Sequence, residues 1–249
     1  MTKPKLGMVY LCAPTHVELK DHAGTPLPRV DLGEKAIEVL KQAGVDVVLP
    51  TGMPLVHTIE ESRSVLDEMR QADVDCVLFY HTAWVWPGRH IQAIRELGRP
   101  VILFAEAVPQ GWPTVGLTGM HGALDEVGIE HKTIYGLSSE PETIQRIVSY
   151  ARAARAKNIF RKSRFCTIGG RAMEVPQMDI DQLQWIEEFG IDCDHLDQYA
   201  LVLEAEKITE GEIKSCYDRL ASQVAEIPDL DETVSRAIAL YLGLKALKI

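Results

Sequence analysis

The sequence predicts an α/β protein: a doubly wound parallel-sheet N-terminal domain, followed by an incomplete second α/β domain. Three observations predict this fold class. Short apolar runs recur along the chain, a segment of helical length separates each run from the next, and the runs are apolar throughout rather than alternating. Uniformly apolar strands are buried on both faces, as in a parallel sheet covered by helices. Alternation of strands and helices at these lengths is typical of βαβ units.

Five repeats of this pattern make up the first predicted domain, residues 1–158. The predicted strands span 6–11, 45–50, 75–80, 100–105 and 131–136. The predicted helices span 31–43, 59–72, 88–97, 116–128 and 140–157. Gly44, Gly98 and Gly128 each stand between a helix and the next strand, where a left-handed C-cap is expected.

The pattern restarts in residues 159–249, after a basic stretch with Arg161, Lys162 and Arg164 that we interpret as a solvated linker. The predicted elements are strands at 164–170 and 191–197 and helices at 179–189, 209–224 and 230–247. Two strands would leave unpaired edges and a thin core. We therefore expect this second domain to be truncated and the chain to self-associate. Packing of the last helix on a partner chain is the alternative.

Composition excludes several classes of function. The net charge of −10 and the pI of about 5.3 argue against a protein that neutralises nucleic-acid phosphates. No apolar stretch approaches the ~20 residues of a membrane span, and the N-terminus lacks a secretory pattern. Five scattered cysteines without CxxC spacing indicate reduced core residues. These features predict a cytoplasmic protein.

The residues after each strand are candidate ligand contacts, because doubly wound sheets bind ligands at the carboxyl ends of their strands. Indole faces suit the apolar face of a sugar ring, and His, Gln, Thr and Arg suit its hydroxyl groups. Together these residues predict a binding cleft, although each one alone fits an ordinary core or surface role. The candidates are His16, His22, Arg29, His81, Thr82, Trp84, Trp86, Glu106, Gln110, Trp112, Thr118, His121, Arg171, Glu174 and Asp179.

Sequence motifs for other chemistries are missing. The chain has no GxGxxG after its first strand, no GxxxxGK[ST] and no GxSxG. It also lacks HExxH or another paired ligand spacing, so we expect neither a metal site nor catalytic residues.

Three segments resemble sugar isomerases of the L-fucose/L-arabinose isomerase type. They are HTAWVWPG at 81–88, GLTGMHGALDEVGIEHKTIYG at 116–136 and FCTIGGRAMEVPQMDIDQLQWIEEFGIDCDHLDQYAL at 165–201. The final segment, RAIALYLGLKAL at 236–247, is similar to the helix that precedes the metal-bearing half of these enzymes.

The resemblance implies the N-terminal segment of a metal-dependent aldose–ketose isomerase, which contributes substrate contacts across a subunit interface of a homo-oligomer. The Mn²⁺ of the complete enzyme, and the ligands that hold it, would lie beyond this chain, so no cofactor and no isomerisation are expected of it alone. By position, Trp84 matches a residue that stacks on the sugar, and His121 matches a substrate contact. The predicted substrate-binding set is Trp84, His121, Thr118, His81 and Trp86. The alternative is a non-catalytic cytosolic module that binds a sugar or sugar acid.

Overall fold

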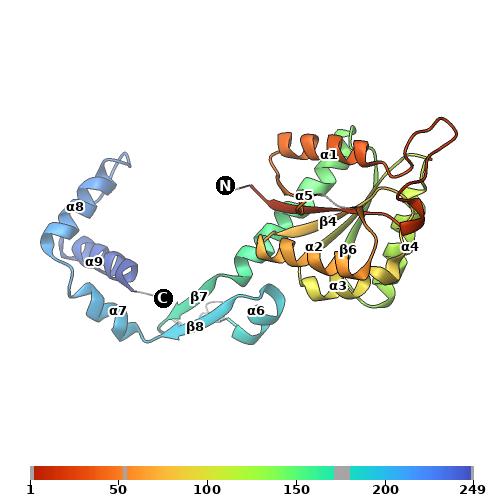
Figure 1. Cartoon of the computed structure of the whole chain (residues 1–249). Coiled ribbons are helices and arrows are strands. Elements are labelled where there is room, and N and C mark those ends of the chain that lie inside the picture. The colour runs from red at the N-terminus through yellow and green to blue at the C-terminus, as the bar shows by residue number, and fades with distance from the viewer. Residues whose placement is uncertain (1–2, 53–54, 171–179, 248–249) are drawn as a thin grey trace. The chain divides into compact units, whose positions relative to one another are not determined.

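The computed structural model describes residues 3–52, 55–170 and 180–247, and the chain divides into two compact units, 1–158 and 159–249 (Figure 1). In the first unit, helices cover both faces of a parallel sheet. This arrangement confirms the predicted α/β fold class.

The sheet of the first unit has the strand order β2-β1-β4-β5-β6. Its strands are β1 (Lys5–Leu11), β2 (Asp46–Val48), β4 (Cys76–His81), β5 (Val101–Glu106) and β6 (His131–Gly136). The short β3 (Leu55–Val56) pairs with the carboxyl end of β1. Because the chain visits β2 and β3 between β1 and the adjacent β4, the direction of winding reverses between β1 and β4.

Two hydrophobic cores lie on opposite faces of this sheet. The five helices that cover it are α1 (Val30–Gln42), α2 (Ile59–Gln71), α3 (Ile91–Leu97), α4 (Pro113–Glu126) and α5 (Pro141–Arg161). Residues of α1 and α5 pack on one face, and residues of α2, α3 and α4 pack on the other. β1, β4 and β5 are buried on both faces, which explains why their sequences are apolar throughout.

The helix ends follow local sequence signals. Thr58 and Glu61 form a capping box at the start of α2, in which each side chain bonds to the other residue's backbone N–H. Gly44, Gly98 and Gly128 have φ angles of 86°, 64° and 68°, as expected for left-handed residues between helix and strand. The first residues of the predicted helix 88–97 instead belong to the 3₁₀ turn η2 (Pro87–Arg89).

The second unit contains, within its described residues, a parallel pair of strands and four helices. The strands are β7 (Arg164–Ile168) and β8 (Asp192–Leu196). The helices are α6 (Gln182–Phe189), α7 (Gln198–Ala205), α8 (Glu210–Ala221) and α9 (Glu232–Ala246). Among the described residues of this unit, the buried apolar side chains are Ile191, Cys216 and Ile238.

The basic residues at 161–164 are exposed, as predicted for a solvated segment, but only residues 162–163 connect α5 to β7. Arg161 is the last residue of α5, and Arg164 is the first residue of β7. The Arg164 guanidinium bonds the Asp192 carboxylate of β8 at 3.0 Å, so this charge is part of a cross-strand pair rather than of a connection.

The predicted glycine-turn residues Arg171, Glu174 and Asp179 lie outside the described residues. No helix in the described ranges combines the length and apolarity needed to cross a membrane.

Candidate functional site

The carboxyl ends of β1 and β4 flank the point where the winding of the sheet reverses, which is where open α/β sheets bind ligands. Backbone hydrogen bonds connect the loops that leave this edge. Arg29 N–H donates to the Thr82 carbonyl at 2.9 Å, and Ala13 N–H donates to the Trp84 carbonyl at 2.6 Å. Trp84 N–H in turn donates to the Gly111 carbonyl at 2.9 Å. The loops after β1, β4 and β5 therefore form one connected frame.

A buried carboxylate lies at this edge. Glu106, the last residue of β5, is only 3% exposed. Its two oxygens accept hydrogen bonds from the Tyr80 hydroxyl at 3.3 Å and from Ser138 N–H at 2.9 Å. The carboxylate of Glu106 is thus hydrogen-bonded by a residue of β4 and by one of the loop after β6. A buried polar group requires such hydrogen-bond partners.

Two tyrosines extend this polar group along the α1 and α5 face of the sheet. The rings of Tyr10 and Tyr80 meet edge to face, with centroids 5.5 Å apart. Burial raises the pKa of both hydroxyls, and the charge of Glu106 adds to the rise at Tyr80. Both therefore stay protonated and can donate hydrogen bonds. Among the described residues, the buried Tyr10 hydroxyl has no hydrogen-bond partner.

Arg29 places a positive charge at the same edge. Its guanidinium bonds both carboxylate oxygens of Asp31, at 2.9 and 2.8 Å. The bond from Arg29 lowers the pKa of Asp31, and the same bond, helped by the charge of Glu106, raises the pKa of Arg29. The backbone bond from Arg29 N–H to the carbonyl of Thr82, two residues beyond Tyr80, places Arg29 beside the end of β4. A fixed guanidinium of this kind is suited to hydroxyl or anionic oxygens of a ligand.

Three indole rings belong to the loops of this edge. Trp84 and Trp86 are half-buried, and the Arg89 guanidinium lies 4.6 Å from the centroid of the Trp86 ring. Trp112 is 54% exposed and lies edge to face with His16, their ring centroids 5.8 Å apart. Its backbone is left-handed, with φ 56° and ψ 42°, a conformation that bulky side chains rarely adopt. Such positions are concentrated at functional sites.

The predicted contact His81 is buried, not presented by a loop. It is the last residue of β4 and is 1% exposed, because the strand extends one residue beyond the predicted 75–80. Its Nδ1 lies 3.2 Å from the carbonyl oxygens of Phe79 and Phe104, so Nδ1 carries the proton. Among the described residues, Nε2 has no hydrogen-bond partner.

The other predicted contacts belong to two different groups. Trp84 and Trp86 lie at the carboxyl edge of the sheet, as predicted. Thr118 and His121 lie on the exposed side of α4, where His121 contacts Asp125 of α4 and His131 and Thr133 of β6. His121 therefore contacts β6, whereas the sequence placed it with Trp84 in one substrate-binding set.

Tyr10, Tyr80 and Ser138 were missed by reasoning from the sequence. The tyrosines lie inside apolar strand segments, and aromatic residues are common there for packing alone. The feature that could have indicated them is their position near the carboxyl ends of two predicted strands. These two strands are adjacent in the sheet, where Tyr10 lies directly opposite Tyr80. Ser138 contributes only its backbone N–H, so its residue type carried no signal.

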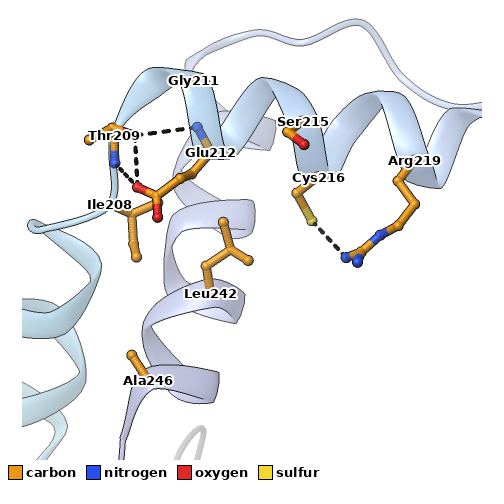
Figure 2. Close-up of a pocket in the computed structure, with 9 residues that line it drawn as sticks. All are labelled: Ile208, Thr209, Gly211, Glu212, Ser215, Cys216, Arg219, Leu242 and Ala246. Atoms are coloured by element: carbon orange, nitrogen blue, oxygen red, sulfur yellow. Dashed lines mark hydrogen bonds between the residues drawn. The ribbon is translucent and has the colours of Figure 1, made fainter.

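A pocket of about 600 Å³ between α8 and α9 of the second unit is a weaker candidate (Figure 2). Most of its polar groups already serve the helices: Glu212 forms a capping box with Thr209, and Arg219 contacts the Cys216 sulfur at 3.6 Å. We therefore place the candidate site at the edge of the first sheet.

The fold defines the class of protein, a doubly wound α/β protein, and the candidate site lies where the winding reverses. Neither a family model nor a curated protein sequence matches the chain. Among solved structures, the chain is similar to an ABC transporter periplasmic solute-binding protein from Actinobacillus succinogenes with bound D-allose. The identity is 14%, the alignment covers 98% of this chain and 91% of that one, and the TM-score is 0.32. Similarity at this level assigns no function.

Proposed function

We propose that this chain is a cytosolic sugar-binding segment of a metal-dependent aldose–ketose isomerase of the fucose/arabinose type. The observation that carries the proposal is the polar and aromatic group at the carboxyl edge of the first sheet. Arg29, bonded through its backbone to Thr82, and the buried Tyr80–Glu106 pair lie beside loops that carry three indole rings. Hydrogen-bonding groups among apolar surfaces are typical of sites for polyhydroxylated ligands.

Each group has a role in this proposal. An indole such as Trp84 covers the C–H face of the sugar ring, as its apolar surface favours. Arg29 donates to sugar oxygens, and the buried Glu106 holds the Tyr80 hydroxyl in place. A site whose buried polar groups need hydroxyl partners discriminates strongly against analogues that lack them.

The Mn²⁺ that the resemblance implies would, when bound, polarise the substrate oxygens. The residues described at the carboxyl edge do not fit such an ion. Asp31 is bonded to Arg29, and both oxygens of Glu106 already accept hydrogen bonds. Under this proposal the chain binds and orients the sugar, and we derive no proton transfer from it.

The second candidate function is a non-catalytic module that binds a sugar or sugar acid. The bonded state of Glu106 is compatible with this candidate, because a carboxylate already held by Tyr80 and Ser138 is suited to binding rather than to acting as a general base. The coding sequence downstream of residue 249 separates the two candidates. A further strand followed by Glu, Asp and His ligands would support the isomerase, whereas a stop codon would support the module.

Calorimetric titration of the purified chain with a panel of aldoses, ketoses and sugar acids tests the proposal. We expect saturable binding of at least one sugar, weakened about tenfold or more by Trp84→Ala, while the thermal midpoint stays nearly unchanged. Trp185→Ala in the second unit is the matched control and should leave sugar binding intact. If Trp84 is a core residue, its truncation instead costs about 3–5 kcal/mol of stability. That loss, combined with unchanged sugar binding, would contradict the assignment.

A further inference from the structure

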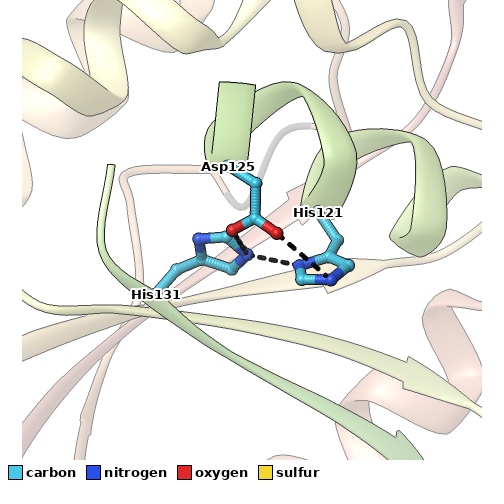
Figure 3. A group of neighbouring side chains, drawn as sticks. All are labelled: His121, Asp125 and His131. Atoms are coloured by element: carbon cyan, nitrogen blue, oxygen red, sulfur yellow. Dashed lines mark hydrogen bonds and ion pairs between the residues drawn. The ribbon is translucent and has the colours of Figure 1, made fainter. Parts of the chain in front are cut away.

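A cluster of two histidines and an aspartate lies outside the proposed sugar site, between α4 and β6 (Figure 3). His121 and Asp125 are four residues apart on α4, so their side chains share one face of the helix. His131 is the first residue of β6, and the turn after α4 brings it back beside them. Each residue offers one ligating atom, and these atoms all lie within 4.8 Å of one another.

A hydrogen bond fixes the orientation of the buried His131 ring. Its side chain is 2% exposed, and its Nδ1 lies 2.8 Å from the Ile129 carbonyl oxygen. A carbonyl only accepts, so Nδ1 carries the proton and the Nε2 lone pair points at His121 and Asp125. Metal-binding histidines are typically oriented by this kind of bond from the second ring nitrogen.

We propose that His121, Asp125 and His131 bind a divalent transition-metal cation of the Zn²⁺ class. Two imidazole nitrogens and one carboxylate oxygen make up a ligand set that suits such cations better than Ca²⁺ or Mg²⁺, which prefer oxygen ligands. Three protein ligands leave a coordination position open to water.

The distances fit a site that closes around the ion with small side-chain movements. His121 Nδ1 is 2.7 Å from His131 Nε2, and the Asp125 oxygens are 3.5 Å from His121 Nε2 and 3.9 Å from His131 Nε2. Tetrahedral zinc separates its nitrogen ligands by about 3.3 Å, given Zn–N bonds of about 2.0–2.1 Å. The side chains of His121 and Asp125 would make this movement. They are 47% and 62% exposed and can turn without disturbing the core.

The cation site is independent of the proposed sugar site, because none of its three ligands belongs to the carboxyl edge. It also revises two expectations from the sequence: that the chain holds no metal site, and that His121 contacts a sugar. The HxxxD spacing of His121 and Asp125 was overlooked in the sequence, and the third ligand becomes apparent only when the turn at 127–130 is folded.

Titration of the tag-free full chain with ZnCl₂, followed by calorimetry, tests the proposal. We expect one equivalent of Zn²⁺ to bind and the thermal midpoint to rise, since a cation that binds only the folded state stabilises it. His121→Gln and Asp125→Asn each remove an exposed ligand and should weaken binding by about 10–100-fold or more. Glu126→Gln, an exposed neighbour of Asp125, is the matched control and should bind as the wild type does.

Substitution by Co²⁺ adds a spectroscopic readout of the ligands. Visible bands of a low-symmetry nitrogen and oxygen site should appear in the wild type and in Glu126→Gln, and should be lost in His121→Gln. Thiolate charge-transfer bands would show that cysteines hold the ion and would overturn the proposal. Stoichiometric binding that survives in the double variant His121→Gln/Asp125→Asn would overturn it as well, as would the absence of binding to the folded wild type.

Discussion

At the scale of single residues, two buried histidines of the first unit have lowered pKa values. Burial lowers the pKa of His81 from 6.5 to about 4, and burial, helped by His81 and Arg89, lowers that of His90 to about 4 as well. His90 bonds the Ser62 hydroxyl at 2.6 Å, and Glu61 opposes the shift. Both rings are therefore neutral in the folded protein at neutral pH.

We predict that acid destabilises the chain between about pH 6.5 and pH 4. In this window the unfolded state binds a proton at each histidine and the folded state does not, so stability falls as pH falls. A shift from 6.5 to about 4 corresponds to roughly 3 kcal/mol of unfolding free energy for each histidine. Urea denaturation at a series of pH values measures the slope.

Substitutions assign this slope to particular rings. His81→Gln removes one titrating ring, so the dependence of unfolding free energy on pH should become shallower. His22→Gln, at an exposed position in the loop after β1, should leave the dependence as it is in the wild type. An unchanged slope in His81→Gln would show that another group causes the acid sensitivity.

At the scale of elements, a glycine sets how closely α4 approaches the loop after β4. A Cβ atom on Gly116 would lie 2.8 Å from the Ala83 carbonyl oxygen and 3.0 Å from Val85 N. Both contacts are with backbone atoms, which cannot move aside as a flexible side chain can. The loop that carries Trp84 and Trp86 therefore depends on this close approach.

We predict that Gly116→Ala destabilises the chain by about 1–3 kcal/mol through overpacking. It should also weaken sugar binding, because the loop that carries Trp84 must shift. Gly122→Ala on the same helix is the matched control, since a Cβ there meets nothing within 4 Å. That control should stabilise the chain by up to about 1 kcal/mol through helix propensity. Thermal denaturation of the two variants compares these effects, and equal midpoints would contradict the packing argument.

The elements of the first unit were largely predictable because each buried strand is an unbroken apolar run. β3 was missed because two residues carry no periodicity, and α7 was missed because its residues at 198–205 follow directly after a strand. The strand-end rule led to Trp84 and Trp86, since it needs only the ends of the strands. It could not place His121, because the pairing of α4 with β6 depends on the geometry of the turn between them.

At the scale of the whole chain, the two units differ in how much apolar surface they bury. The first has two cores on opposite faces of its sheet. In the described part of the second unit, large apolar side chains such as Leu183 and Tyr199 are 79% and 64% exposed. Regions with few buried apolar contacts open at low free-energy cost.

We predict that backbone amides in the described helices and strands of the second unit exchange with deuterium much faster than those of the strands in the first unit. Mass spectrometry of peptides after pulse labelling measures this difference. Leu103→Ala, which removes a core side chain of β5, should speed exchange in the first unit and leave peptides of the second unit unchanged. Equal protection across both units, lost together in one transition, would contradict a division into separately stable units.

The loops at the carboxyl edge are tied together by main-chain hydrogen bonds at Ala13, Arg29 and Trp84, and these bonds do not depend on side-chain identity. Evolution can therefore exchange the side chains at 84, 86 and 112 without dismantling the frame that positions them. New ligand preferences would arise by substitution at these three loop positions. A side chain at Gly111 or Gly116 would instead clash with neighbouring backbone atoms. In related chains we expect sequence diversity at the indole positions and invariance at these two glycines.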